Sequence, residues 1–163
     1  MNHSTNTQDI EKIYDRYKNL LYGIAFAYLK NNADVEDVLQ EVFLKRIYHA
    51  PIFQSEEHEK RWMIRITVNM SRNVLKSFWN QNTGGIDEDI ISSLSQCNLT
   101  ERESNLVEMV YRLPEKQRIV IYLYYFEGYS CKEIADILSK SESAVKMRLK
   151  KGRTQLKTML DKE

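Results

Sequence analysis

Apolar residues recur every three or four positions through the first half of the chain, a spacing typical of one face of an amphipathic helix. This pattern predicts a helix over Asp9–Lys30, which the polar pair Asn31-Asn32 ends. A second helix is predicted from near Ala33 to the residues before Pro51, and a third from about Glu59 to Trp79.

Residues 80–104 have a different character, because they are polar, acidic and contain Gly84-Gly85. A connection of this length exceeds most connections within a domain, so it predicts a flexible linker and a domain boundary. We therefore expect an N-terminal helical domain over residues 1–79, an acidic linker over 80–104 and a C-terminal domain over 105–163.

The C-terminal domain carries clear signals for helix ends. Pro114 suits the first turn of a helix that Gly128 ends. Ser130 and Glu133 have the spacing of a capping box, and Ser141 is a good N-cap for the next helix. Two short capped helices joined by three or four residues predict a helix-turn-helix.

Composition supports an all-α fold of two small helical domains. The chain has five Gly and two Pro, and no alternating run with hairpin turns. Its two cysteines and three histidines are scattered, so we expect no metal, no cofactor, no small-molecule substrate and no enzymatic activity. No signal peptide or membrane-spanning stretch is present, and we expect a cytoplasmic protein without direct membrane insertion.

The net charge of +1 conceals strong segregation of charge. The last predicted helix is strongly basic, and a solvated surface helix is the simpler explanation. Here the charge follows a helix-turn-helix, so we expect the early turns of this helix to face base edges and the later cations to hold phosphates. The residues expected to bind DNA in this way are Ser141, Ser143, Lys146, Arg148, Lys150, Lys151 and Arg153.

The third predicted helix carries a second polar stripe. Cations that seek phosphates alternate there with amides that hydrogen-bond base edges. Acidic residues are absent from its stretch 60–76, which favours a nucleic-acid surface over a merely solvated face. The stripe consists of Arg61, Arg65, Asn69, Arg72, Asn73 and Lys76.

The second predicted helix is acidic on the face opposite its apolar residues. Acids early in a helix also cap it and keep it soluble, and spacing alone does not exclude that role. The alternative is a docking surface for a basic macromolecular partner. The residues concerned are Asp34, Asp37, Gln40 and Glu41.

Three stretches together resemble the extracytoplasmic-function (ECF) sigma factors of the sigma-70 family, and the likeness runs from about Ile13 to Leu156. The stretches are DVEDVLQEVFLK, RWMIRITVNMSRN and LPEKQRIVIYLYYFEGYSCKEIADILSKSESAVKMRLKKGRTQLK. The resemblance implies that the acidic helix docks on core RNA polymerase. It implies that the third helix meets the downstream (−10) promoter element as the duplex opens, and that the last helix reads the upstream (−35) element.

The resemblance also implies that the segment Ile52–Glu59 is a specificity loop that pockets an extruded base. It implies an anti-sigma factor as a partner, for which Tyr124, Tyr125 and Tyr129 or the linker are candidate contacts. Ser139 departs from the family, which commonly has glycine at this turn, and Ser is expected to enter the turn at modest strain.

Two other functions fit parts of the sequence. A stand-alone helix-turn-helix regulator that binds duplex DNA explains residues 130–156 but leaves the acidic helix and the third-helix stripe without a role. An enzyme acting on nucleic acid would need paired carboxylates, a metal set or a phosphate loop, and the sequence presents no such motif.

Overall fold

The computed structural model describes residues 7–79 and 101–162, and every regular element in these ranges is helical. The elements are α1 (Thr7–Leu29), α2 (Asn32–Tyr48), α3 (Glu56–Trp79), α5 (Glu101–Arg112), α6 (Glu115–Ile121), the π-helical turn η1 (Tyr122–Phe126), α7 (Cys131–Leu138) and α8 (Glu142–Asp161). The all-α prediction is confirmed. The predicted linker lies outside the described residues except for 101–104, which already belong to α5.

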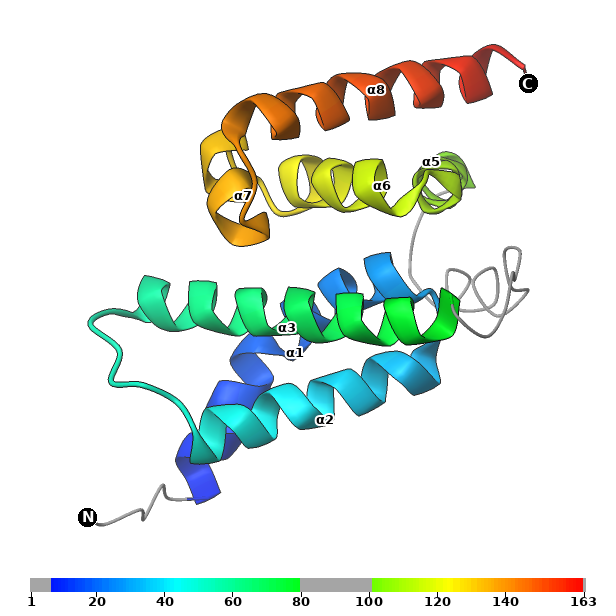
Figure 1. Cartoon of the computed structure of the whole chain (residues 1–163). Helices are drawn as coiled ribbons and strands as arrows, with labels where there is room; N and C mark the ends of the chain where they lie inside the picture. The colour runs from blue at the N-terminus through cyan, green and yellow to red at the C-terminus, as the bar shows by residue number, and fades with distance from the viewer. Residues whose placement is uncertain (1–6, 80–100, 163) are drawn as a thin grey trace.

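Helices α1, α2 and α3 pack together as an N-terminal half (Figure 1). Val38 and Val42 of α2 and Ile64 of α3 are buried in its core. An ion pair of 2.7 Å between Arg46 and Glu59 ties the end of α2 to the start of α3. Among the described residues, no helix has both the length and the apolar character needed to cross a membrane.

Helix α3 begins earlier than the sequence predicted, at Glu56 rather than about Glu59. The hydroxyl of Ser55 accepts a hydrogen bond of 3.1 Å from the backbone N–H of His58, which caps the first turn. The acids that made this segment look like a loop are first-turn residues, favoured there by the helix dipole. The irregular connection is therefore shorter than the predicted Ile52–Glu59 loop.

Helices α5 to α8 form a C-terminal half in which the predicted caps are present. Ser130 and Glu133 make both hydrogen bonds of a capping box at α7, and Ser141 caps α8 through the N–H of Ala144. Ser139 ends α7 in the left-handed conformation with a φ of 54°. The helix-turn-helix prediction is thus confirmed, with the non-glycine residue in the strained position of the turn.

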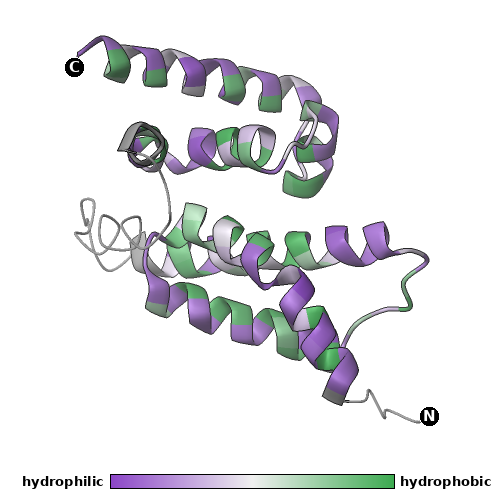
Figure 2. Cartoon of the chain, turned by 180° about the vertical axis from the view of Figure 1, so that it is seen from behind, coloured by the Kyte–Doolittle hydropathy of each residue, from purple (hydrophilic) through white to green (hydrophobic). Residues whose placement is uncertain are grey.

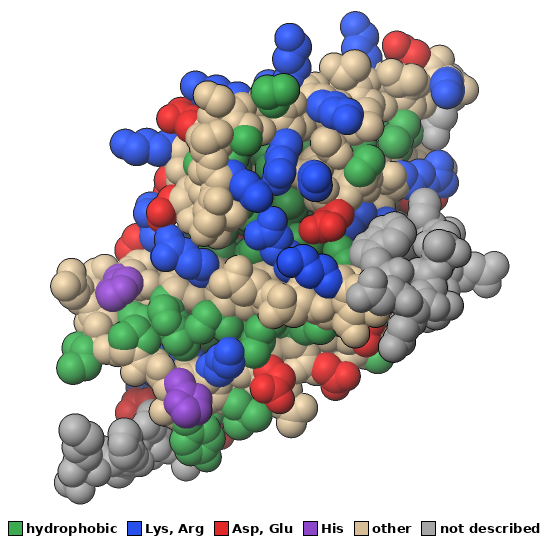
Figure 3. Space-filling model, viewed as in Figure 1, with side chains coloured by type: hydrophobic (Ala, Val, Ile, Leu, Met, Phe, Trp, Pro, Cys, Tyr) green, Lys and Arg blue, Asp and Glu red, His purple; other side chains and the backbone are tan. Residues whose placement is uncertain are grey.

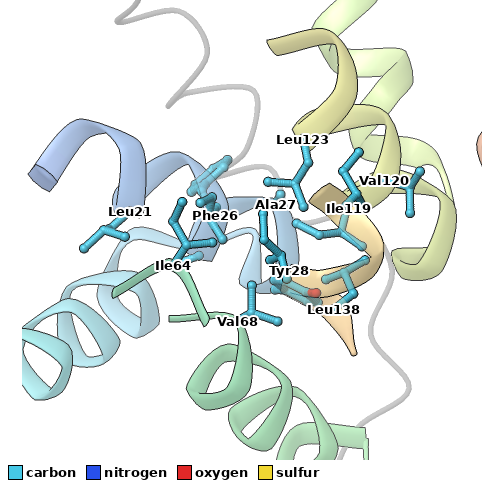
Figure 4. Close-up of a cluster of buried hydrophobic side chains, with 14 of the residues drawn as sticks. Leu21, Phe26, Ala27, Tyr28, Ile64, Val68, Ile119, Val120, Leu123 and Leu138 are labelled. Atoms are coloured by element: carbon cyan, nitrogen blue, oxygen red, sulfur yellow. The ribbon is translucent and has the colours of Figure 1, made fainter. Parts of the chain in front are cut away.

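The two halves share a single buried cluster of apolar side chains. Figure 4 shows Phe26, Ala27 and Tyr28 of α1 between α3 on one side and α6 and α7 on the other. The rings of Phe26 and Tyr111 meet edge to face at 5.3 Å between centroids. The green apolar positions along the inner faces of both halves in Figure 2 belong to this core.

Arg118 of α6 fixes this contact with polar bonds. Its side chain is 4% exposed and donates to the carbonyl oxygens of Ala27 at the end of α1 and of Leu113, the latter at 2.9 Å. Burial lowers the pKa of Arg118 well below its usual range, to about 10. The guanidinium satisfies carbonyls that the end of a helix leaves without partners.

Candidate nucleic-acid interface

The first turns of α8 present a polar face to solvent. Val145 and Leu149 of this helix are buried, which directs the opposite side outward. Ser143, Lys146, Lys150 and Lys151 are all exposed on this side. The predicted DNA-binding residues of α8 are therefore placed where a duplex can reach them.

Two of the remaining predicted residues have an additional local role, and a third is not fully exposed. Ser141 is exposed but its hydroxyl is the N-cap of the helix. Arg148 is half-buried. Arg153 lies 5.5 Å from the ring centroids of Tyr124 and Tyr125, and its Nε donates to the Tyr125 hydroxyl at 2.5 Å. Arg153 thus braces η1 against α8, a role that the sequence pattern did not predict.

The stripe on α3 runs along most of the helix. Asn69, Asn73 and Lys76 are exposed, while Arg72 is half-buried. On the inner side Met63, Ile64 and Val68 are fully buried. Asn69, Asn73 and Lys76 therefore lie on the outer surface of this helix, whereas Arg72 is partly covered.

At its N-terminal end the stripe is engaged by α7. Arg61 forms ion pairs with Glu133 at 3.1 Å and with Asp136 at 3.7 Å. Arg65 donates to the Asp136 carboxylate at 3.0 Å. Hydrogen bonds from Ser130, and more weakly the charge of Arg61, lower the pKa of Glu133. No pattern in the sequence predicted that these two arginines face the first helix of the helix-turn-helix.

Positive charge gathers around this contact. Figure 3 shows Lys and Arg side chains along the boundary between the two halves and over the side that carries α8. Lys60 adds to the contact, because its ammonium lies 5.6 Å from the ring centroid of Tyr129. Tyr129 is only 6% exposed, so the expectation that it is available to an anti-sigma factor is wrong, whereas Tyr125 is 54% exposed.

The segment before α3 forms a small aromatic cluster. The ring of Phe53 meets His58 at 5.3 Å and Trp62 at 5.5 Å, in both cases edge to face. The guanidinium of Arg46 lies 5.0 Å from the Phe53 ring centroid. Ile52, which precedes Phe53 in the chain, is 94% exposed. An anchored aromatic beside an exposed apolar residue is an arrangement able to contact an unstacked base.

Each acidic residue in this region forms an ion pair with a neighbouring arginine. Glu56 pairs with Arg16 at 2.6 Å and Glu57 with Arg61 at 3.2 Å, in addition to the pair of Glu59 with Arg46. The Glu59 carboxylate is buried in its ion pair, whereas those of Glu56 and Glu57 pair with local cations while they stay exposed. This explains why a predicted DNA-facing segment is rich in acids.

The predicted polymerase-binding residues of α2 fall into two groups. Asp37, Gln40 and Glu41 are exposed. Asp34 is half-buried and accepts a hydrogen bond of 2.7 Å from the Asn31 amide, so it helps to cap α2. The alternative role of acids as capping residues thus applies to Asp34.

A groove between α1 and α2 adds an apolar component that the sequence analysis missed. Its volume is about 470 Å³, and Gln40 is among its lining residues. The other lining residues are Tyr14, Lys18, Asn19, Tyr22, Glu36, Leu39, Phe43, Leu44 and Ile47. The available signal was Leu44, an apolar residue outside the buried stripe of α2 that is 41% exposed; Tyr14 of α1, 47% exposed, follows the apolar pattern of its own helix.

The described residues contain no group of three or more His, Cys, Asp or Glu side chains able to hold a metal ion.

Comparison with known proteins identifies the family. The chain matches "Sigma-70 region 2" over residues 13–80 and "Sigma-70, region 4" over residues 103–156. RNA polymerase sigma factor SigZ of Bacillus subtilis (strain 168) is 31% identical over 158 residues, which cover 94% of this chain and 88% of SigZ. ECF RNA polymerase sigma factor SigW of the same organism is 26% identical over 168 residues, which cover 91% of this chain and 87% of SigW.

The fold is similar to that of the sigma factor RpoE in its co-crystal structure with the anti-sigma factor NepR from Bartonella quintana. The TM-score is 0.70 at 16% identity, covering 95% of this chain and 98% of RpoE. Matches to both sigma regions, in order, do not favour a stand-alone regulator. The chain therefore belongs to the sigma-70 family and is an RNA polymerase sigma factor of the ECF type.

Proposed function

We propose that this sigma factor divides its work among three surfaces: the α1–α2 groove with its acidic rim binds core RNA polymerase, α3 binds the −10 element and α8 binds the −35 element. The observation that carries the proposal is the placement of exposed polar sets on three separate helices of a chain with both sigma regions. The expected domains 1–79 and 105–163 then each hold one promoter element, joined by residues 80–104.

The polymerase surface combines charge with an apolar cavity. Asp37 and Glu41 supply negative charge, and Leu44 and Phe43 lie in the groove beside Gln40. Such a surface suits a basic helix that inserts one apolar side chain, because apolar anchors in a pocket supply most of the binding energy while rim charges steer association. The fitting partner is a helical segment of core RNA polymerase.

The −10 surface suits single-stranded DNA. Asn69 and Asn73 offer amides for base edges, and Arg72 and Lys76 offer cations for phosphates. Phe53 and Trp62 stand near the start of the same helix, where an extruded base would gain stacking to offset the cost of leaving the duplex. The protein would thus promote melting by binding the opened strand, with no catalytic step of its own.

An anti-sigma factor is the expected regulator. RpoE, the structural relative described above, was crystallised with such a partner. In this chain Tyr125 and Phe126 of η1 are 54% and 46% exposed, which offers an aromatic surface to a protein. Action with polymerase on promoter DNA places the protein in the cytoplasm.

Run-off transcription tests the proposal directly. Core polymerase from the same source is assayed on genomic promoter fragments with and without this protein, and discrete transcripts are expected only in its presence. Changing Asp37 and Gln40 to alanine should abolish the transcripts by preventing association with polymerase. Footprinting of duplex DNA by the protein alone, without any transcript, would instead support a stand-alone regulator.

Asn69→Ala separates promoter opening from polymerase binding. This variant should associate with core polymerase normally, since Asn69 lies on α3 and not in the α1–α2 groove, yet open promoters about tenfold less well. Gln40→Ala, which also removes one exposed amide, should show the reverse pattern. Normal opening by Asn69→Ala at every promoter tested would show that the role assigned to α3 is wrong.

A further inference from the structure

The outermost ridge of α8 carries an apolar residue among cations. Met147 is 73% exposed, and rotation of 100° per residue places it opposite the buried Val145 and Leu149. Ser143 and Lys150 share its ridge, and Lys146 and Lys151 flank it. A large apolar side chain therefore stands at the position of the recognition helix farthest from the protein core.

Single exposed apolar residues are common on proteins, so the surroundings of Met147 have to decide its role. The flanking lysines are suited to phosphates on either side of a groove, and binding them would press the ridge between them toward the base edges. Packing within the protein leaves most of the Met147 side chain exposed to solvent. The exposed surface of Met147 is therefore free to contact whatever α8 binds.

The major groove offers one apolar group to such a side chain. Base edges there present hydrogen-bond donors and acceptors, except for the C5-methyl group of thymine. Methionine is unbranched and flexible, which lets it reach a methyl group without a fixed backbone geometry. Resting on the proposed function, we propose that Met147 is a specificity-determining residue that recognises a thymine methyl in the −35 element.

Deoxyuridine provides a test, because it differs from thymidine only by lacking this methyl group. Each thymine on either strand of the upstream element is replaced singly by deoxyuridine, in promoter fragments that give transcripts with core polymerase and the wild-type chain. Affinity of the complete holoenzyme is measured for each fragment. At one position the loss of the methyl should weaken wild-type binding about fourfold, the effect of exposing one methylene-sized group.

The variant Met147→Ala should bind the unmodified fragment about fourfold more weakly and be insensitive to deoxyuridine at that same position. Lys150→Ala is the matched control on the same ridge. It should bind all fragments more weakly and with a shallower salt dependence, while remaining sensitive to the missing methyl. The exposure of both side chains makes either variant compatible with folding.

The outcomes separate this inference from the proposed function. One outcome is that the fragments give transcripts, but removal of a thymine methyl affects the wild type and Met147→Ala equally at every position. This outcome would overturn the inference and leave the proposed function standing. Equal weakening of Met147→Ala on every fragment, with full methyl sensitivity retained, would also overturn it and assign Met147 to a protein contact. Absence of transcripts from all fragments would overturn the proposed function and this inference with it.

Discussion

Lys30 and Arg118 are two cations near the C-terminal end of α1. Arg118 donates to the carbonyls of Ala27 and Leu113, whereas Lys30 follows the helix with a φ of 60°. Burial, and to a lesser degree the charge of Arg118, lowers the pKa of Lys30 from 10.5 to about 8. The C-terminal end of a helix favours positive charge. The charged form of Lys30 is nevertheless destabilised, because the residue is partly buried and lies near Arg118.

This destabilisation of the charged form predicts a pH-dependent stability. Between about pH 8 and pH 10.5 the unfolded chain binds more protons at Lys30 than the folded chain, so this residue makes the free energy of unfolding rise with pH across that window. Lys30→Met should therefore stabilise the protein at about pH 7, and its advantage should vanish toward about pH 10. Urea denaturation of both proteins at the two pH values measures the difference.

Lys157→Met removes an exposed lysine from α8 and controls for the loss of a surface charge. All of these proteins contain the same tyrosines, so tyrosine titration changes their free energies of unfolding equally and cancels when they are compared at one pH. If the stability gained by Lys30→Met stays constant with pH, the gain does not come from the lowered pKa of Lys30.

At the scale of elements, helix ends were largely predictable because caps are local. Ser130, Glu133 and Ser141 cap the helices at which the sequence placed them, and Gly128 adopts a φ of 74°. The start of α3 was missed, since the acids after Ser55 resemble a loop as much as a first turn. Their pairing with Arg16 and Arg46 depends on neighbours brought together only by folding.

The turn of the helix-turn-helix carries a testable strain. Ser139 lies in the left-handed region, where a Cβ atom costs about 1 kcal/mol relative to glycine. Ser139→Gly should therefore raise the free energy of unfolding by about 0.5 kcal/mol, after allowance for the larger entropy of the unfolded chain. Chemical denaturation of the full chain measures the gain.

Ser143→Gly makes the same chemical change at a helical position in the first turn of α8. It should destabilise the protein by up to about 1 kcal/mol, because glycine is a poor helix former. Equal effects of the two substitutions would show that the conformation of Ser139 carries no strain.

At the scale of the whole molecule, the relation between the halves was not predictable from the sequence. The stripe on α3 follows from helical periodicity. The contact of Arg61 and Arg65 with α7, in contrast, joins residues that are 72 and 71 positions apart in the sequence, on either side of the linker. The α1–α2 groove likewise depends on how two helices cross. Local sequence patterns therefore predicted which residues form each surface. Which surfaces contact each other depends on tertiary packing.

The contact has a consequence for DNA binding by the free protein. The carboxylate of Asp136 holds Arg65 at 3.0 Å and Arg61 at 3.7 Å, so a phosphate has to displace it. Exposed ion pairs contribute about 0–1 kcal/mol each, which makes the competition weak but measurable. Asp136→Asn should therefore bind single-stranded −10 DNA a few-fold more tightly than the wild type in fluorescence anisotropy.

Asp37→Asn is the matched control, because it makes the same change in net charge on α2, away from the contact. It should leave DNA affinity nearly unchanged at moderate salt, where distant charges are screened. Equal gains in both variants would mean that net charge, and not the loss of the Asp136 ion pairs with Arg65 and Arg61, raises the affinity.

Gly23 allows the contact between the halves to be tested without altering a charge. This glycine lies inside α1, where alanine alone would favour the helix by about 1 kcal/mol. A Cβ atom at this position would clash with the hydroxyl group of Tyr122 of η1, so Gly23→Ala should force the halves apart while keeping α1 helical. Small-angle scattering should then show a larger radius of gyration, and Tyr122→Phe in the same chain should partly reverse it. An unchanged radius with a raised melting temperature would show that the halves accommodate the methyl group and stay closed.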